Sequence, residues 1–231
     1  NGQEQSRQSK RSPGMPSEVS PAARGAIAPP EPSSLGIHAD LAADRVGPNA
    51  IIQTRKALDV LCGIARRTAI FEQAGLGALG DDRLRDLVDV GQVNALNQAI
   101  GRRLQPQLAH AVLRRAGDLT GAYVLENRIP KPAHHLLKAL PRAIAQRLLM
   151  KAIAKNAWTF AGQARVETGA DWILIHANPI CQGRLGFSCC EWHVAVFSRL
   201  FQTLVDPRIQ ICETHCNGQG SEGCRFTVQT G

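Results

Sequence analysis

The chain has 231 residues, 44% hydrophobic and 20% charged, so most of it is expected to fold around one sizeable core. No run of about 18 apolar residues occurs, which excludes a membrane-spanning helix from the prediction. The formal net charge is +8, and residues 48–157 hold 17 basic and 8 acidic side chains. An anionic partner is therefore expected to meet this middle region.

The cysteine content bears on the compartment. Seven cysteines occur, and the start of the sequence shows no apolar signal-peptide core. Reduced thiols in the cytoplasm are therefore expected rather than a disulfide framework, and metal ligation is the leading use of any cysteines that cluster.

Residues 1–47 are rich in Pro, Ser, Gly and charge without an apolar period, and they predict a disordered tail. A helical region, 48–157, is expected to begin at "GPNAIIQTRKALDVLCGIARRTAI". The stretch "AYVLENRIPKP" is expected to be extended, because its two prolines stop a helix. Further helical patterns cover residues 82–90, 93–104 and 108–116.

Two basic helices are expected next, at "AHHLLKAL" and "RAIAQRLLMKAIAKNAW". Arg147, Lys151 and Lys155 recur every four residues, which places them on one side of an amphipathic helix. From 128 to 155 there are seven basic residues and no acidic one. This face is either a solvated surface, a contact for an acidic ligand or an anionic membrane surface.

The pattern changes in residues 158–231. "WTFAGQARVE" and "DWILIHA" predict strands, "CCEWHVAVFSRLFQTLV" a helix, and "RIQICETHC" with "CRFTVQT" a hairpin. The predicted fold class is α+β, with a helical N-terminal half packed on a small antiparallel sheet that carries one long helix.

The pattern G-x-G-x-x-G occurs once, at "GLGALG" in residues 75–80. A helix rather than a strand is expected before it, so it predicts a loop and not a dinucleotide site. We find no NAD or flavin motif and thus no evident hydride source.

Soft ligands gather near the end of the sequence. Glu213 and Cys216 are expected at the end of one strand and Cys224 at the start of the next, with Cys189 or Cys190 at a helix start as the fourth ligand. This set suits a structural zinc ion. Glu213 and Cys216 would lie on opposite faces of a regular strand, so the strand must end or bulge between them. Cys212 and His215 are competing ligands, and ordinary half-buried thiols are the alternative without metal.

A family resemblance adds to this. "CCEWHVAVFSRLF" and "ICETHCNGQGSEGCRFTV" resemble the 4-vinyl-reductase domain family, and "GPNAIIQ", "YVLENRIP" and "NAWTFAGQA" resemble its bacteriochlorophyll-biosynthesis J branch. The resemblance implies a zinc site at Cys190, Glu213, Cys216 and Cys224. It further implies bacteriochlorophyll synthesis, with reduction of the C8 (4-)vinyl group of divinyl protochlorophyllide or chlorophyllide.

Such a pigment is a flat macrocycle with a carboxylate and a central Mg²⁺. Phe160 is a further candidate wall of its cleft, and His176 or His193 is a candidate axial magnesium ligand. The basic candidates for its carboxylate also include His134, Arg142 and Lys155. The residues expected to bind the pigment are Arg128, Lys131, His135, Arg147, Lys151, Trp158 and Trp172.

The expected partners are this pigment, other pigment-synthesis enzymes and the photosynthetic membrane, with a homodimer as a further alternative. Nucleic-acid binding is not expected, because no recognition module is present. Without a visible hydride donor, the alternative to a reductase is a non-catalytic tetrapyrrole carrier, or a small-molecule-sensing or assembly module with a structural zinc site.

Overall fold

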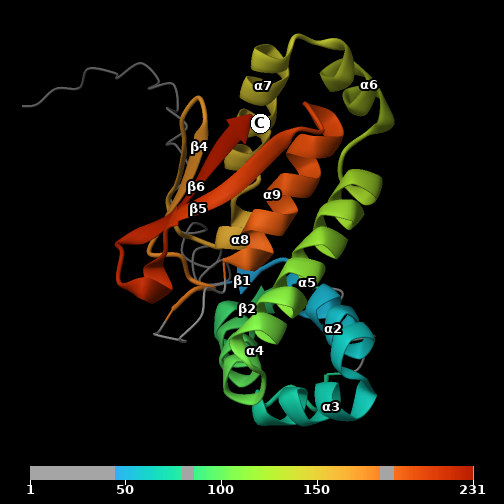
Figure 1. Cartoon of the computed structure of the whole chain (residues 1–231), viewed down its shortest axis with the longest axis vertical. Coiled ribbons are helices and arrows are strands. Elements are labelled where there is room, and N and C mark those ends of the chain that lie inside the picture. The colour runs from blue at the N-terminus through green and yellow to red at the C-terminus, as the bar shows by residue number, and fades with distance from the viewer. Residues whose placement is uncertain (1–44, 80–85, 183–189, 231) are drawn as a thin grey trace, which may run out of the picture. The chain divides into compact units, whose positions relative to one another are not determined.

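The computed structural model describes residues 45–79, 86–182 and 190–230, which belong to one compact unit (Figure 1). Most of the predicted tail lies outside these residues, but its end contradicts the prediction of disorder. Arg45–Val46 forms strand β1, which pairs antiparallel with β2, Val88–Asp89. The second strand also replaces the end of the helix predicted over 82–90, of which residues 82–85 lie outside the described residues. Val46 and Val88 are buried, so apolar burial fixes this pair.

Helices make up most of the described chain before residue 158 (Figure 1). Several begin or end at the predicted signals, because Pro and Gly lie at their boundaries. They are α2 (Asn49–Cys62), α3 (Ile64–Gln73), α4 (Val90–Arg103), α5 (Pro106–Asn127), α6 (Lys131–Ala139) and α7 (Arg142–Lys155).

Helix α5 contradicts the extended segment predicted at "AYVLENRIPKP". The helix continues to Asn127, because Leu125 on its inner side is buried and no proline occurs before Pro130. Pro130 caps α6 and Pro132 lies in its first turn, where a missing N–H costs little. The prolines therefore separate two helices rather than forming a strand.

The strand predicted at "WTFAGQARVE" is also wrong in its first half. Trp158–Ala161 forms a short helix, α8, whose last residue is buried. Gly162, at a φ of 56°, ends this helix, and strand β3 covers only Val166–Thr168. Aromatic content near Trp158 suggested a strand, but a buried alanine on each side of the turn favours the helix.

The second half of the fold is a sheet covered by one helix, as predicted. All neighbours in the sheet are antiparallel, in the order β3–β4–β6–β5. The strands after β3 are β4 (Trp172–His176), β5 (Ile209–His215) and β6 (Gly223–Thr230), and the helix is α9 (Glu191–Leu204). The rings of Phe197 on α9 and Phe226 on β6 meet at 5.4 Å, so α9 covers the face of the sheet that Phe226 occupies (Figure 1).

Helices α5 and α9 lie side by side and join the helical part to the sheet layer (Figure 1). Two glycines of α5 permit their close approach. A Cβ atom on Gly117 would collide with the backbone oxygen of Trp192, and one on Gly121 would lie 2.7 Å from Cβ of Arg199. Such contacts are far below van der Waals distance, so the backbones pack directly on one another here.

Candidate metal centre

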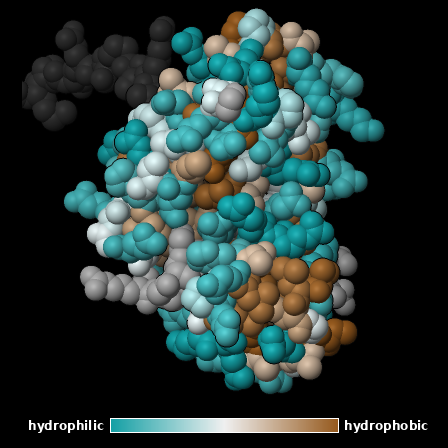
Figure 2. Space-filling view, in the orientation of Figure 1, coloured by the Kyte–Doolittle hydropathy of each residue, from teal (hydrophilic) through white to brown (hydrophobic). Residues whose placement is uncertain are grey.

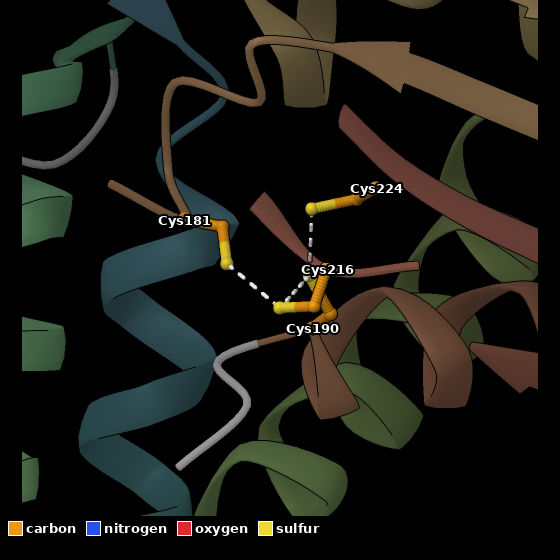
Figure 3. A group of neighbouring side chains, drawn as sticks. All are labelled: Cys181, Cys190, Cys216 and Cys224. Carbon is orange, nitrogen blue, oxygen red and sulfur yellow. Dashed lines mark hydrogen bonds between the residues drawn. The ribbon is translucent and has the colours of Figure 1, made fainter. Parts of the chain in front are cut away.

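Four cysteine side chains converge at the end of the sheet next to the start of α9 (Figure 3). Cys181 lies in the segment after β4, Cys190 is the N-cap of α9, Cys216 follows β5, and Cys224 is in β6. The four sulfur atoms lie within 4.8 Å of one another, and all four residues are buried. Four separate stretches of chain are thus brought to one point, which we call the cysteine cluster.

The sulfur spacing suits a shared metal ion. The Sγ–Sγ distances are 3.1 Å for Cys190 and Cys224, 3.6 Å for Cys181 and Cys216, and 4.0 Å for Cys190 and Cys216. A disulfide would require about 2.05 Å. Tetrahedral thiolates at roughly 2.3 Å from zinc lie roughly 3.8 Å apart, in the middle of the observed values. The donor set therefore fits zinc.

The surroundings of the cluster favour sulfur as an acceptor of positive charge. The backbone N–H of Asn217 donates to Sγ of Cys224 at 3.3 Å, and the side-chain amide of Asn217 donates to the Cys181 carbonyl at 3.1 Å. Cys190 lies at the N-terminus of α9, whose dipole favours a thiolate. Asn217 therefore orients two of the cysteines, as hydrogen bonds around metal ligands commonly do.

The thiols are costly to ionise without a cation. The Cys181 thiol and then burial raise the pKa of the Cys224 thiol. Metal binding requires thiolates, so a divalent cation would supply the charge that burial removes. A site with four thiolates leaves no coordination position for water and is structural by chemistry.

Cys190, Cys216 and Cys224 were predicted as ligands and do lie together, but the predicted carboxylate does not join them. Glu213 is not among the clustered ligand atoms. It pairs with Phe226, two residues along β6 from Cys224, which amounts to roughly 6–7 Å of strand. The fourth side chain in the cluster is Cys181, which the sequence reading did not select.

The expected irregularity between Glu213 and Cys216 is present. The pairing of β5 with β6 shifts by one residue between Glu213 and His215, which leaves Thr214 as a bulge. Glu213 and Cys216 therefore come to the same side of the sheet instead of opposite sides. This bulge is what brings Cys216 to the buried face.

The competing ligands lie apart from the cluster or outside the described residues. Cys212 is half-buried, with its thiol 3.7 Å from the side-chain oxygen of Gln229, and His215 is exposed. Cys189 lies outside the described residues. A signal for Cys181 existed in "NPICQG", a turn directly after a predicted strand, but only the pairing of β4 with β6 brings that turn to Cys224.

The residues predicted to bind pigment are dispersed. Arg128 follows α5, Lys131 and His135 are on α6, and Arg147 and Lys151 are on α7, all of them exposed.

The two predicted aromatic walls also lie apart, in different elements. Trp158 of α8 is 52% exposed, and Trp172 of β4 stacks under Arg225, whose guanidinium carbon is 4.7 Å from the ring centre. The structure therefore does not gather these side chains around one cavity.

A cavity of about 500 Å³ lies elsewhere, between α5, α9 and β5. Its lining combines apolar residues with two arginines, each already in an ion pair. Arg114 contacts Glu191 at 2.8 Å, and Arg199 contacts Asp118 at 3.6 Å. None of the predicted pigment residues lines this cavity.

The two candidate axial histidines differ in environment. His193 is buried among the rings of Phe160, Phe197, Phe226 and Trp192, and burial lowers its pKa to about 3. It is a neutral core residue. His176 is partly exposed and lies 3.1 Å from the Glu167 carboxylate.

Comparison with known proteins places this architecture in a class. The family model of the 4-vinyl-reductase domain matches residues 172–230, which include every residue of the cysteine cluster, so the sheet and α9 form a domain of this family. The fold resembles that of an H-NOX protein from S. oneidensis, solved in its Fe(II)NO ligation state, with a TM-score of 0.50 and 12% identity. That likeness covers 80% of this chain and 99% of the other.

Two relatives define the family more closely. The bacteriochlorophyll synthase 23 kDa chain of Cereibacter sphaeroides is 39% identical over 190 residues, which cover 80% of this chain and 91% of that protein. The protein of the same name from Rhodobacter capsulatus is 37% identical over 187 residues, covering 80% and 86%. This chain belongs to the family of the bacteriochlorophyll synthase 23 kDa chain.

Proposed function

We propose that this protein acts in bacteriochlorophyll synthesis, where it binds divinyl protochlorophyllide or chlorophyllide and takes part in reduction of the C8 vinyl group. The similarity to the bacteriochlorophyll synthase 23 kDa chains, over 80% of the chain, carries the proposal. The match to the 4-vinyl-reductase domain family supports it, because that match falls on the region whose motifs resemble the same family.

The zinc ion is proposed as a structural part of this protein. Cys181, Cys190, Cys216 and Cys224 would hold it, and when bound it would supply a fixed cross-link between α9, β5 and β6. Structural zinc contributes apparent free energies of about 10–16 kcal/mol in small zinc-dependent folds. The ion thus stabilises the scaffold and does not take part in the reduction.

The cavity between α5, α9 and β5 is our candidate site for the pigment. Its volume, about 500 Å³, is within the usual range of ligand pockets, about 300–1,000 Å³. Val194 and Ile211 offer apolar surface, and Arg114 and Arg199 offer cations for a carboxylate. The exposed residues predicted from sequence, such as Arg147 and Lys151, form the rival site.

A titration with divinyl protochlorophyllide tests both sites. The purified full chain should shift the pigment's absorbance, and Ser198→Phe, which fills the cavity, should weaken binding about tenfold or more. Arg147→Ala together with Lys151→Ala should then leave binding within about twofold, since surface pairs contribute little. No spectral change with the unaltered chain would contradict the proposed function, and the reverse order of the variants would move the site to α7.

Catalysis and carriage are separated by turnover. If the chain reduces the pigment, monovinyl product should form with the purified protein and NADPH or reduced ferredoxin. A carrier would give no product alone but would accelerate a separate reductase. A gene deletion that leaves the pigment composition unchanged would instead favour a sensing or assembly module.

The proposed setting is the cytoplasm, at the surface of the photosynthetic membrane, next to other pigment-synthesis enzymes. The relatives carry the name of a synthase chain, which supports association with pathway enzymes. No helix in the described ranges has the length and apolarity to cross a bilayer.

A further inference from the structure

Helices α6 and α7 form a hairpin that packs loosely on the rest of the fold (Figure 1). No residue of α6 is buried. Large apolar side chains face solvent on both helices: Leu136 is 57% exposed, Ile144 47% and Leu148 40%. Exposed apolar side chains gathered on one segment commonly mark an interaction surface.

The same hairpin carries an unbalanced positive charge. Residues 128–155 hold seven basic side chains and no acidic one. Among the described residues, the only ion pair to any of the seven is that of Arg142 with Asp206, at 4.0 Å. The cations are therefore available to an external anionic surface.

Helix α7 places the two kinds of side chain next to each other. Ala145, Leu149 and Ile153 are buried against the fold. Ile144 and Leu148 lie one turn apart on the outer side, and Arg147 and Lys151 form the adjoining row. Figure 2 shows teal and brown side chains interspersed over the region of α6 and α7 at the top of the view.

A bilayer surface with anionic headgroups matches this combination. Apolar side chains enter the boundary between headgroups and acyl chains, while long Lys and Arg side chains reach the phosphates. Each such cation near an anionic leaflet adds attraction that weakens with salt. An acidic protein would satisfy the charges but would not need apolar residues spread along both helices.

A second exposed apolar patch lacks this charge asymmetry and serves as a control. Val60, Leu61 and Ile64 are exposed where α2 meets α3, under the brown area at the lower right of Figure 2. Acidic Asp59 is beside them, in an ion pair with Arg67 at 2.9 Å. The chemistry there does not select an anionic partner.

We propose that the hairpin of α6 and α7, residues 131–155, is a docking surface for an anionic lipid bilayer. This surface is separate from the cysteine cluster and the cavity, and the proposal does not depend on vinyl reduction. Binding should require both the cations and the apolar side chains, and it should weaken as the salt concentration rises.

Flotation of the full chain with vesicles tests the proposal without pigment. The protein should float with phosphatidylcholine vesicles that contain phosphatidylglycerol and remain behind with pure phosphatidylcholine. Arg147→Glu with Lys151→Glu should lower the partition coefficient about tenfold or more, and Ile144→Ser with Leu148→Ser should lower it severalfold. Inorganic phosphate should compete no better than sodium chloride of equal ionic strength, which distinguishes a bilayer from a free phosphate site.

Matched changes at the second patch provide the control. Lys56→Glu with Arg66→Glu alters the net charge equally, and Val60→Ser with Ile64→Ser removes similar apolar surface. These should keep flotation within about twofold of the unaltered chain. Arg147→Gln with Lys151→Gln provides a milder variant if charge reversal disturbs folding. Equal loss from the control pairs, or no flotation of the unaltered chain at low salt, would overturn the proposal.

Discussion

The four buried cysteines make a direct prediction about single side chains. Cys181→Ser should lower zinc affinity by more than the roughly 10- to 100-fold that a change around the ligands costs, because it removes a proposed ligand. Glu213→Gln should retain zinc, since this carboxylate is not among the clustered atoms. Competition with a chromogenic chelator measures both affinities.

Cys212→Ser is the matched control for this pair, because Cys212 is half-buried in β5 and is not in the cluster. It should bind zinc like the unaltered chain. Loss of zinc in Glu213→Gln with retention in Cys181→Ser would restore the ligand set that the family resemblance implied.

His193 should make stability depend on pH. Burial lowers its pKa to about 3, whereas an exposed histidine titrates near 6.5. As the pH falls below about 6.5, the unfolded chain binds a proton that the folded chain does not, so stability falls. Between about pH 7.5 and about pH 5.5 this costs about 1.4 kcal/mol in the free energy of unfolding.

Urea denaturation of the unaltered chain and of His193→Leu measures this contribution. The cysteine cluster is common to both proteins, so acid release of a metal affects both and cancels in the difference. The unaltered chain should lose about 1.4 kcal/mol more than the variant over this interval. Parallel pH dependence of the two would contradict the assignment of His193 as a neutral core residue.

The contact of α5 with α9 predicts an unusual sign for a glycine substitution. Within a helix, Gly→Ala normally stabilises by roughly 0.5–1 kcal/mol. Gly117→Ala should instead destabilise by about 1–3 kcal/mol, because its Cβ would collide with the Trp192 oxygen. Chemical denaturation measures the change, and Ala111→Ser, on the exposed side of α5, should be nearly neutral.

Secondary structure was readable wherever a local pattern was strong. The helix at 191–204 and the hairpin of β5 and β6 were predicted, because their apolar periods differ clearly. Even the bulge near Thr214 followed from the conflict between strand period and the spacing of Glu213 and Cys216. The wrong assignments, the end of α5 and α8, were decided by burial against distant segments, which a local pattern does not contain.

The same limit explains the fourth member of the cysteine cluster. Cys216 and Cys224 belong to one hairpin, so their meeting is a local property of the sequence. Cys181 reaches them only because β4 pairs with β6, which places Ile175 opposite Cys224. That pairing joins segments about fifty residues apart and has no signature in either segment.

Across the described residues, the parts with proposed functions lie in separate regions. The cysteine cluster belongs to the 4-vinyl-reductase domain, the cavity lies where α5 and α9 meet β5, and the basic surface belongs to α6 and α7. The positive middle of the sequence thus corresponds, in its strongest part, to one exposed hairpin. Because α9 contributes to both the cluster and the cavity, a metal that fixes its start would also fix one wall of the cavity.

X-ray absorption at the zinc edge of the purified full chain tests the proposed metal centre most directly. We predict one zinc ion per chain with four sulfur neighbours at roughly 2.3 Å and no oxygen or nitrogen neighbour. Three sulfur neighbours with one oxygen at roughly 2.0–2.2 Å would contradict a role for Cys181, and a chain without bound zinc would contradict the metal centre itself.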